Sequence, residues 1–532
     1  MKTYDYIVIG SGFGGSVSAM RLAEKGYDVL ILEEGKHRRD TDFPKSNNNP
    51  FRFFWFPKIF CRGYQRIDFF RHLAVLGGCG VGGGSIIYAN SLLVPEDAVF
   101  QGSDFPKGVD WKDDLAPFYK TASRMLGKTE NPVRTQMDDL LKEGAEEKRR
   151  GDTFHFVDIG VYFGEPEITV PDPYFKGEGP ERTGCNLCAG CMVGCRVGAK
   201  NSLAKNYLHF AQKFGALIEA QRRVIDISKD GGEWVVSACK STGLLPSKKY
   251  KYRAKNVIVS AGVIGSLKLL FELKRKKRVE ISDRLGWAVR SNSESLIGVR
   301  KPGRDVNLAE GVAITSAVYI DDTTHIQAVR YPKGSNAMSL ISTFLTEKNK
   351  GVFRPLTMLK NTILHPIKTF KVLNPIGWAK QTVILLVMQT EDNRIRLTAK
   401  RKLLGGIKLA SRLEDGKKKA PVYIPQANEF AKRMAAKMKG IPLSCVYEVF
   451  FDTPLTAHIL GGCVVGSDKN AGVIDANHKL FGYDNFYVVD ASAIPANLGV
   501  NPALTIAAMA ERAMDKIDFK NAKSKNGKRI GY

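Results

Sequence analysis

The chain has 532 residues, 44% of them hydrophobic, and its 80 Lys and Arg against 54 Asp and Glu give a formal net charge of +26. This length exceeds what one hydrophobic core usually fills, so more than one structural unit is expected. The longest apolar run, the six residues from Val383 to Met388, is far shorter than the roughly twenty residues of a membrane-spanning helix. The positive charge is spread along the chain without a zinc-finger, helix-turn-helix or RNA-binding signature, which argues against a nucleic-acid partner.

The first predicted elements form a strand-helix-strand unit. The apolar run at residues 6–9 leads into Gly10-Ser11-Gly12-Phe13-Gly14-Gly15, a helical pattern follows, and the apolar run at 29–32 ends at Glu33. G-x-G-x-x-G between a strand and a helix is typical of Rossmann-like domains that bind dinucleotides. The first strand begins so early that a secretory leader has no room ahead of it, so we expect a cytoplasmic protein.

Each residue of this fingerprint has a physical role. Gly10 permits the tight turn, Gly12 lets the backbone approach a pyrophosphate at the helix N-terminus, and Gly15 lets the helix pack closely on the sheet. Glu33 is placed to bind a ribose 2′-hydroxyl, which argues against NADP. The alternative is a glycine-rich turn without a ligand.

Two segments, 51–60 and 353–378, interleave large apolar side chains with basic ones. The first contains six aromatic residues, and the second has the pattern of an amphipathic helix broken at Pro366. Such mixtures suit the headgroup boundary of a membrane. They predict peripheral contact with an anionic membrane on its inner face, and the alternative is a covered core or a subunit interface.

A second glycine cluster spans residues 76–85 and includes Gly80, Gly82 and Gly83, with Ser85 at its end and Asn90 shortly after. So many glycines indicate a backbone pressed against a flat or bulky group.

Four of the nine cysteines lie within eleven residues, with the spacing C-x2-C-x2-C-x3-C: Cys185, Cys188, Cys191 and Cys195. This is the bacterial ferredoxin run without its final proline. It predicts an iron-sulfur cluster, 3Fe-4S or 4Fe-4S. A structural zinc site and free or redox-paired thiols are the alternatives.

The last informative segments lie in the second half of the chain. A buried strand at 256–260 turns through Ala261 and Gly262 into a helix, as a returning strand of the same sheet would. Three C-terminal blocks follow: 456–463 with His458, 486–495 with Asp490, and 501–512, which begins at Asn501.

These C-terminal blocks, with the N-terminal fingerprint and the loop at 77–90, resemble the glucose-methanol-choline (GMC) oxidoreductases, and most closely their cholesterol-oxidase-like branch. The resemblance covers about half of the chain and leaves 100–180 and 300–450 loosely matched. It implies an α/β fold, in which a discontinuous Rossmann-like FAD-binding domain carries an inserted α+β substrate domain. The expected bounds are 1–105, 185–300 and 450–516 for the FAD domain, 106–184 and 301–449 for the substrate domain and connections, and 517–532 for a basic tail.

The resemblance also implies roles for single residues. The expected FAD contacts are Gly10, Gly12, Gly15, Glu33, Gly80, Gly82, Gly83, Ser85, Asn90, Ala261, Gly262, Asp490 and Asn501. His458 and Asn501 resemble the family's catalytic pair. A histidine can take the hydroxyl proton as hydride leaves carbon, and an asparagine amide can stabilise the developing charge without titrating.

One departure concerns the carboxylate that cholesterol oxidases use as a base, because the loosely corresponding stretch 326–336 contains none. The proton acceptor therefore stays open. The cysteine run predicts a one-electron exit to an acceptor such as a quinone, ferredoxin or flavoprotein in place of oxygen.

The sequence as a whole predicts an FAD-dependent oxidoreductase that moves a hydride between a hydrophobic alcohol or ketone and the flavin, with sterols, steroids and long-chain lipids as leading substrates. One alternative is a reductase of an unsaturated or keto lipid. Another is an electron-transfer flavoprotein subunit that binds no substrate of its own.

Overall fold

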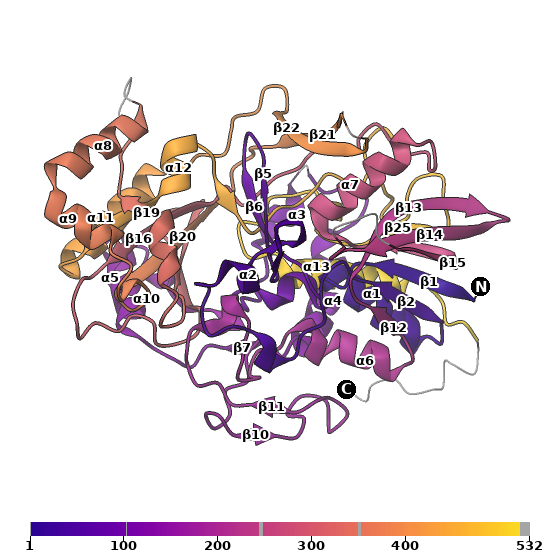
Figure 1. Cartoon of the computed structure of the whole chain (residues 1–532), viewed down its shortest axis with the longest axis horizontal. Helices are drawn as coiled ribbons and strands as arrows, with labels where there is room; N and C mark the ends of the chain where they lie inside the picture. Colours follow the sequence, from indigo (N-terminus) through magenta and orange to yellow (C-terminus); the bar gives the residue numbers. More distant parts are fainter. Residues whose placement is uncertain (1, 103, 244–247, 349–352, 404, 522–532) are drawn as a thin grey trace.

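The computed structural model describes residues 2–102, 104–243, 248–348, 353–403 and 405–521 (Figure 1). Two seven-stranded sheets organise them, one toward each end of the long axis, and the segments that carry the candidate site run between the sheets. The predicted mixed α/β architecture with an N-terminal Rossmann-like unit is confirmed.

The first sheet has the order β12-β2-β1-β15-β14-β13, and β25 also pairs with β15. Its strands are β1 (Thr3–Ile9), β2 (Val29–Leu32), β12 (Leu217–Glu219), β13 (Arg222–Asp230), β14 (Glu233–Lys240), β15 (Lys249–Val259) and β25 (Phe486–Val488). Strands β12, β2, β1, β15 and β25 run parallel to one another, whereas β13 and β14 form an antiparallel edge.

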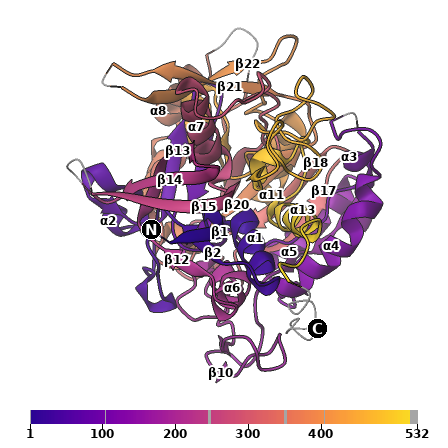
Figure 2. The ribbon, with the colours of Figure 1, turned by 90° about the vertical axis from the view of Figure 1, so that its right-hand side faces the viewer.

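Helices cover both faces of this sheet, which explains why β1 and β2 are apolar without alternation. On one side lie α1 (Phe13–Glu24), α4 (Trp111–Met125), α6 (Tyr207–Lys213) and α13 (Ala503–Asp515), and on the other lies α7 (Gly262–Arg275) (Figures 1 and 2). The largest hydrophobic core of the molecule forms between them.

The second sheet is antiparallel, with the order β19-β23-β16-β20-β18-β17-β8. Its strands are β8 (His155–Phe156), β16 (Ser295–Arg300), β17 (Ile314–Tyr319), β18 (Thr324–Val329), β19 (Ser342–Phe344), β20 (Thr382–Gln389) and β23 (Ile441–Cys445). Helices α5 (Gln136–Glu147) and α11 (Pro425–Lys437) pack on one face, against side chains such as Ile326 and Ala328. The alternate residues of β18, His325 and Gln327, therefore point to the opposite face.

Smaller elements join these parts. Strand β24 (Leu455–Thr456) runs parallel to β6 (Ala74–Gly78), which pairs with β5 (Gln65–Phe69). This pairing brings the segment that carries His458 next to the second glycine cluster. The remaining helices and strands are α2 (Pro50–Phe53), β3 (Trp55–Phe56), β4 (Cys61–Arg62), α3 (Asp97–Gln101), β7 (Thr129–Glu130), β9 (Asp158–Ile159), β10 (Thr169–Val170), β11 (Arg182–Thr183), α8 (Arg354–Leu364), α9 (Pro366–Leu373), α10 (Trp378–Gln381), β21 (Ile395–Arg401), β22 (Ile407–Leu413) and α12 (Val446–Phe451).

The two segments with a membrane-like composition have different surroundings. In the first, Phe53 and Trp55 are buried, so the alternative of a covered core holds for them. The second forms α8 and α9, with Pro366 as the first residue of α9, which confirms the predicted break. Along the described residues, no helix combines the length and the hydropathy needed to cross a membrane.

Part of the basic tail is packed against the N-terminal strand. Lys520 donates a hydrogen bond from its backbone N to Lys25 O, 3.1 Å, and its Nζ lies 2.5 Å from Asp5 Oδ2. Residues 518–521 of the expected basic tail therefore have a defined place beside the N-terminal strand, and residues 522–532 lie outside the described ones.

Candidate active site

The fingerprint loop of residues 10–15 is built on backbone contacts that only glycine allows. Gly10 has φ +100°, and a Cβ there would lie 2.3 Å from Ser260 O on the neighbouring strand. A Cβ on Gly15 would lie 2.1 Å from Gly10 O. At Gly12, in contrast, no described atom lies within 4 Å of the Cβ position. The loop is therefore packed tightly at Gly10 and Gly15 and open at Gly12, where a phosphate group has space.

The second glycine cluster lies directly on this loop. A Cβ on Gly83, which has φ +50°, would lie 2.6 Å from the Cα of Gly12. Gly82 donates its N–H to Ser11 Oγ, 3.1 Å, and that hydroxyl donates to Glu33 Oε2, 2.8 Å. The carboxylate at the end of β2 thus ties both loops together, and burial raises the pKa of Glu33.

Other predicted contact residues lie around this cradle with different partners. The Ser85 hydroxyl donates to Gly82 O, 2.7 Å, and accepts from Leu203 N, 3.1 Å, so it is used within the loop. Asn90 is fully buried with φ +70°, and neither its amide nitrogen nor its amide oxygen has a partner among the described residues.

Asp490 closes the cradle at the start of α7. It accepts from Ser492 N, 2.8 Å, and from Ser266 Oγ, 2.5 Å, and burial raises its pKa. Ala261 and Gly262, the latter with φ +71°, form the turn from β15 into α7, and no described atom lies within 4 Å of a Cβ on Gly262. Asp490 therefore orients this turn through serine hydroxyls.

His458 follows β24 and faces a carboxylate that comes from the second sheet. Its Nδ1 lies close to Glu294 Oε1, and only 1% of the Glu294 side chain is exposed. The other carboxylate oxygen, Oε2, accepts from Ala457 N, 3.0 Å. The backbone of the histidine loop thus holds Glu294 in place, and the carboxylate in turn orients the imidazole.

Asn501 approaches the same imidazole from the other side. Its Nδ2 lies 3.2 Å from His458 Nε2, and its Oδ1 accepts from Gln327 Nε2, 2.8 Å. Gln327 is fully buried on β18, and its own Oε1 has no partner among the described residues. The structure therefore brings the predicted pair His458 and Asn501 together and adds Glu294 and Gln327.

The orientation of two side-chain amides sets the tautomer of the histidine. Gln327 Nε2 donates to Asn501 Oδ1, and with the amides placed in this way the Asn501 nitrogen faces Nε2 of His458. Nε2 is then an acceptor, and Nδ1 carries the proton toward Glu294. A histidine in this state can take a proton at Nε2, and the buried carboxylate stabilises the imidazolium that results.

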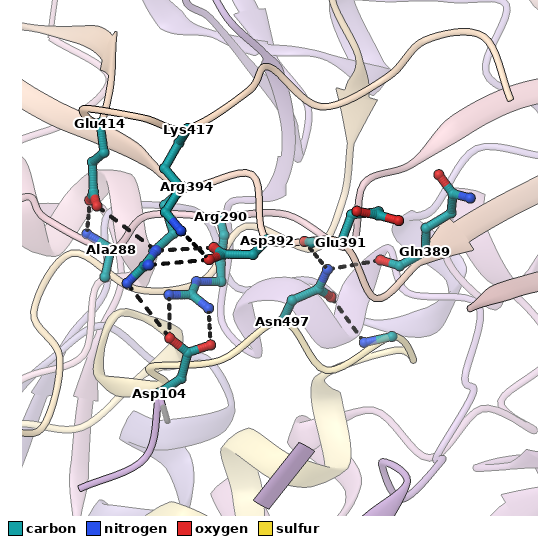
Figure 3. A network of polar contacts seen from close by, with 11 residues as sticks. Asp104, Ala288, Arg290, Gln389, Glu391, Asp392, Arg394, Glu414, Lys417 and Asn497 are labelled. Atoms are coloured by element: carbon teal, nitrogen blue, oxygen red, sulfur yellow. Dashed lines mark hydrogen bonds and ion pairs between the residues drawn. The ribbon is translucent and has the colours of Figure 1, made fainter. Parts of the chain in front are cut away.

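A polar network beside the site fixes the two loops that carry the pair (Figure 3). Arg290 exchanges backbone hydrogen bonds with Leu460, 3.0 and 2.8 Å, and its guanidinium binds Asp104 at 2.5 and 3.1 Å. Asn497 donates to Gln389 O, 2.8 Å, and accepts from Gly499 N, 3.0 Å. These contacts lie at one end of the second sheet, where the start of β16 meets the end of β20, and hold the loops that carry His458 and Asn501.

The cysteine loop lies behind the second glycine cluster. Buried Lys200 donates to the carbonyl oxygens of Ile86, Tyr88 and Cys191, at 3.0, 2.9 and 2.8 Å, and burial lowers its pKa to about 8. Burial raises the pKa of Cys185 to about 12 and that of Cys191 to about 11. These thiols are protonated at neutral pH in this state.

All four predicted cysteine ligands border one cavity of about 20 Å³, which Asn90 and Lys200 also line. That volume holds roughly one water molecule, not a cluster. Within the described ranges, no group of three or more His, Cys, Asp or Glu side chains is placed to bind a metal ion. The four cysteines converge as the spacing predicts, but their present geometry does not fit a cluster.

Comparison with known proteins gives the chain its family. Models described as "GMC oxidoreductase" match residues 180–272 and 400–510, and one described as "NAD(P)-binding Rossmann-like domain" matches 8–66. A cholesterol oxidase of Acinetobacter baumannii is 44% identical, over 97% of this chain and 95% of that protein. The chain belongs to the GMC oxidoreductase family. A cholesterol oxidase of Mycobacterium tuberculosis (strain ATCC 25618 / H37Rv), also 44% identical over 96% of this chain and 90% of its own, places it in the cholesterol-oxidase-like branch.

Solved structures agree on the fold of this GMC oxidoreductase. Pyridoxine 4-oxidase from Mesorbium loti matches with a TM-score of 0.62 at 15% identity, covering 97% of this chain and 99% of the other. A fungal aryl-alcohol oxidase matches with a TM-score of 0.58 at 14% identity, over 97% and 98% of the two chains.

This GMC oxidoreductase is an FAD-dependent enzyme, and its cradle fits that cofactor. The open position at Gly12 suits a pyrophosphate, and Glu33 lies where the ribose is expected. Buried Asn90, whose amide has no partner among the described residues, could offer both a donor and an acceptor to the polar edge of a flavin ring.

The stretch 326–336 contains no carboxylate, but the structure places Glu294, which the sequence patterns did not indicate, beside His458. Glu294 stands directly before the apolar strand β16, within the polar run Ser291-Asn292-Ser293-Glu294-Ser295. A carboxylate at the start of a buried strand was the available signal, but its partner His458 is more than 160 residues away.

Proposed function

We propose that this enzyme oxidises the hydroxyl group of a sterol or another hydrophobic alcohol, with His458 as the proton acceptor. The observation that carries the proposal is the buried arrangement Glu294, His458, Asn501, in which Nδ1 of the imidazole lies against the carboxylate and Nε2 lies 3.2 Å from the Asn501 amide nitrogen. The 44% identity to cholesterol oxidases supports the sterol class, and a 23% identical long-chain-alcohol oxidase of Arabidopsis thaliana supports the wider class of lipid alcohols.

Each residue of the site has its own role in the proposed alcohol oxidation. A substrate hydroxyl that enters between His458 and Asn501 donates its proton to Nε2 and accepts an N–H from Asn501. As the proton moves, Glu294 stabilises the positive imidazolium, and Asn501 stabilises the negative charge on oxygen. Bound FAD supplies the acceptor for the hydride that leaves carbon. Gln327 positions the Asn501 amide so that its nitrogen, not its oxygen, faces the substrate.

The reductase alternative uses the same residues in reverse, with the imidazolium of His458 returning a proton to a keto oxygen. The electron-transfer subunit alternative needs no such pair, and the burial of Glu294 and Gln327 around His458 counts against it. Anaerobic flavin spectra separate the three. Cholesterol or a long-chain alcohol should bleach the oxidised flavin. Reoxidation of reduced flavin by a steroid enone, without bleaching by alcohols, would support the reductase.

The iron-sulfur cluster and the acceptor other than oxygen stay predictions. Convergence of four cysteines on one cavity beside Asn90 supports them, whereas the size of that cavity counts against them. Iron, sulfide and zinc analysis of anaerobically purified protein, repeated on Cys188→Ser, tests them. Iron with sulfide that is lost in the variant supports a cluster. Zinc, or no metal, would indicate that the cysteine loop is structural, and oxygen would then be the expected electron acceptor.

The catalytic assignment is tested with His458→Ala. We expect turnover of cholesterol to fall far more than the FAD content, because the imidazole contacts Glu294 and Asn501 rather than the glycine loops. Loss of flavin in proportion to activity would show that His458 is structural.

A further inference from the structure

The helical pair formed by α8 and α9 exposes a set of large apolar side chains. It projects from the second sheet at the end of the molecule farthest from the first sheet (Figure 1). Ile363, Ile367 and Phe370 are 68%, 73% and 70% exposed. Further exposed residues along this pair are Phe353, Leu356, Leu359, Leu364, Leu373 and Ile376. A contiguous apolar surface of this kind marks an interaction site.

The pair is held firmly from beneath. Buried Arg300 donates to the carbonyl oxygens of Val372, 3.0 Å, and Asn374, 2.7 Å, at the end of α9. Buried Arg354, the first residue of α8, donates to Thr346 O, 3.0 Å. The hydroxyl of Thr369 on α9 donates to Thr362 O on α8, 3.0 Å, and so joins the two helices. The exposed side chains are therefore presented outward by fixed backbone.

The charge on this segment is of one sign. Residues 353–381 contain four lysines and one arginine but no Asp or Glu. Lys360, Lys368 and Lys371 are exposed beside the apolar side chains. The surface therefore combines apolar insertion with positive charge, which is the pattern of a helix that lies in a lipid headgroup region.

Neighbouring aromatic residues extend the surface. Helix α12 lies beside α8 and exposes Phe450 and Phe451, and the Phe451 ring packs on Tyr447 with centroids 5.0 Å apart. Tyr447 in turn packs on Phe69 at the end of β5, 5.8 Å, and Phe69 is itself 59% exposed.

We propose that α8 and α9, with α12 and Phe69, form a docking surface for a bilayer that contains anionic phospholipids. Acidic headgroups complement the lysines, and the apolar side chains enter the acyl boundary. A second copy of the chain is disfavoured, because a two-fold contact through this face would bring lysines against lysines. If the proposed function holds, docking also brings the enzyme to the bilayer in which a sterol or lipid alcohol resides.

Vesicle binding of the full chain, measured by co-sedimentation without substrate, tests the surface. Phosphatidylcholine vesicles are compared with vesicles that also contain phosphatidylglycerol. We expect clear preference for the anionic vesicles, weakened by salt. Each lysine near an anionic surface contributes about a five-fold gain in binding, so the combined substitution Lys360→Gln, Lys368→Gln, Lys371→Gln should weaken it roughly 100-fold.

The matched control has the same charge change at the start of β15 in the first sheet, where the lysines are also exposed: Lys248→Gln, Lys249→Gln, Lys251→Gln. This control should keep nearly all of its binding to anionic vesicles. A second test variant, Ile363→Ser, Ile367→Ser, Phe370→Ser, removes the apolar side chains and should lose most of its binding. Equal loss in control and test variants would overturn the proposal, because net charge alone would then explain the binding. A dimer in sedimentation velocity that dissociates in the serine variant would overturn it in favour of self-association. Neither outcome depends on which substrate the enzyme oxidises.

Discussion

Replacing Glu294 with glutamine removes the negative charge that lies against Nδ1 of His458 and keeps the shape of the side chain. The consequence follows from the second contact of this residue. Ala457 N donates to one carboxylate oxygen, so the amide oxygen of glutamine must take that position. The amide NH2 then faces Nδ1 and imposes an acceptor there, which moves the imidazole proton to Nε2.

This tautomer can no longer accept the substrate proton, and no charge remains to stabilise an imidazolium. A buried carboxylate-to-amide change of this type beside a catalytic histidine lowers turnover by about 10,000-fold in the serine proteases, and general-base catalysis as a whole is worth about 100- to 10,000-fold. We expect Glu294→Gln to lower the rate of flavin reduction by about 1,000-fold, or about 4 kcal/mol of activation free energy.

The assay is anaerobic stopped-flow reduction of the flavin by cholesterol, with FAD content read from the absorption spectrum. The control is Glu448→Gln, another fully buried glutamate, on α12, which accepts from Ser295 Oγ and Leu296 N. The control should reduce its flavin at close to the normal rate. A loss of less than ten-fold in Glu294→Gln, with full flavin content, would refute the role given to this carboxylate.

Three further outcomes follow from contacts described above. Gly83→Ala places a Cβ 2.6 Å from the Cα of Gly12 and should lower the FAD content several-fold. The control Gly77→Ala has no described atom within 4 Å of its Cβ and should keep the normal FAD content. Equal flavin content in the two variants would contradict the role of the close approach of Gly83 to Gly12. Gln327→Met frees the Asn501 amide to turn and should slow flavin reduction about ten-fold at unchanged FAD content, as expected for loss of one positioning hydrogen bond; a normal rate would show that Asn501 is fixed by other means. Burial lowers the pKa of His478 to about 4. As the pH falls below about 6.5, this histidine therefore binds a proton in the unfolded chain but not in the folded chain, and the free energy of unfolding decreases. Between pH 7 and pH 5 this costs about 2 kcal/mol, which should disappear from the unfolding free energy of His478→Gln but not of His365→Gln, whose histidine is exposed.

Local patterns were sufficient to predict the strand-helix-strand unit that opens the first sheet, because β1, the fingerprint loop, β2 and Glu33 lie within about thirty residues of chain. The contacts of Gly10 with Ser260 and of Gly12 with Gly83 join parts of the chain that are far apart in sequence. His458 and Asn501 were found through the family resemblance, since neither residue is distinctive by itself. Their closeness at 3.2 Å agrees with the predicted pair.

The parts that were missed depend on long-range pairing. Glu294 meets His458 only because Arg290 and Leu460 pair across the molecule. Gln327 meets Asn501 because β18 turns its odd-numbered residues away from α5 and α11, and periodicity gives no partner for that face. The aromatic run at 51–60 contains both buried and exposed residues. Phe53 packs against Tyr64 in a small core, whereas Phe51 and Phe60 are exposed, and composition does not distinguish the two.

The strand order of the first sheet has a consequence for synthesis of the chain. Strand β1 pairs with β15, and β15 is flanked by β25, which ends at Val488. At ribosomal rates of about 5 to 20 residues per second, roughly 25 to 100 s separate the emergence of β1 from that of β25. Until β25 emerges, residues Val257–Val259 of β15 keep an open, apolar edge, which favours association of newly made chains with one another. A premature stop before β25 would leave that edge open permanently and would yield an aggregating fragment rather than an inactive but folded enzyme.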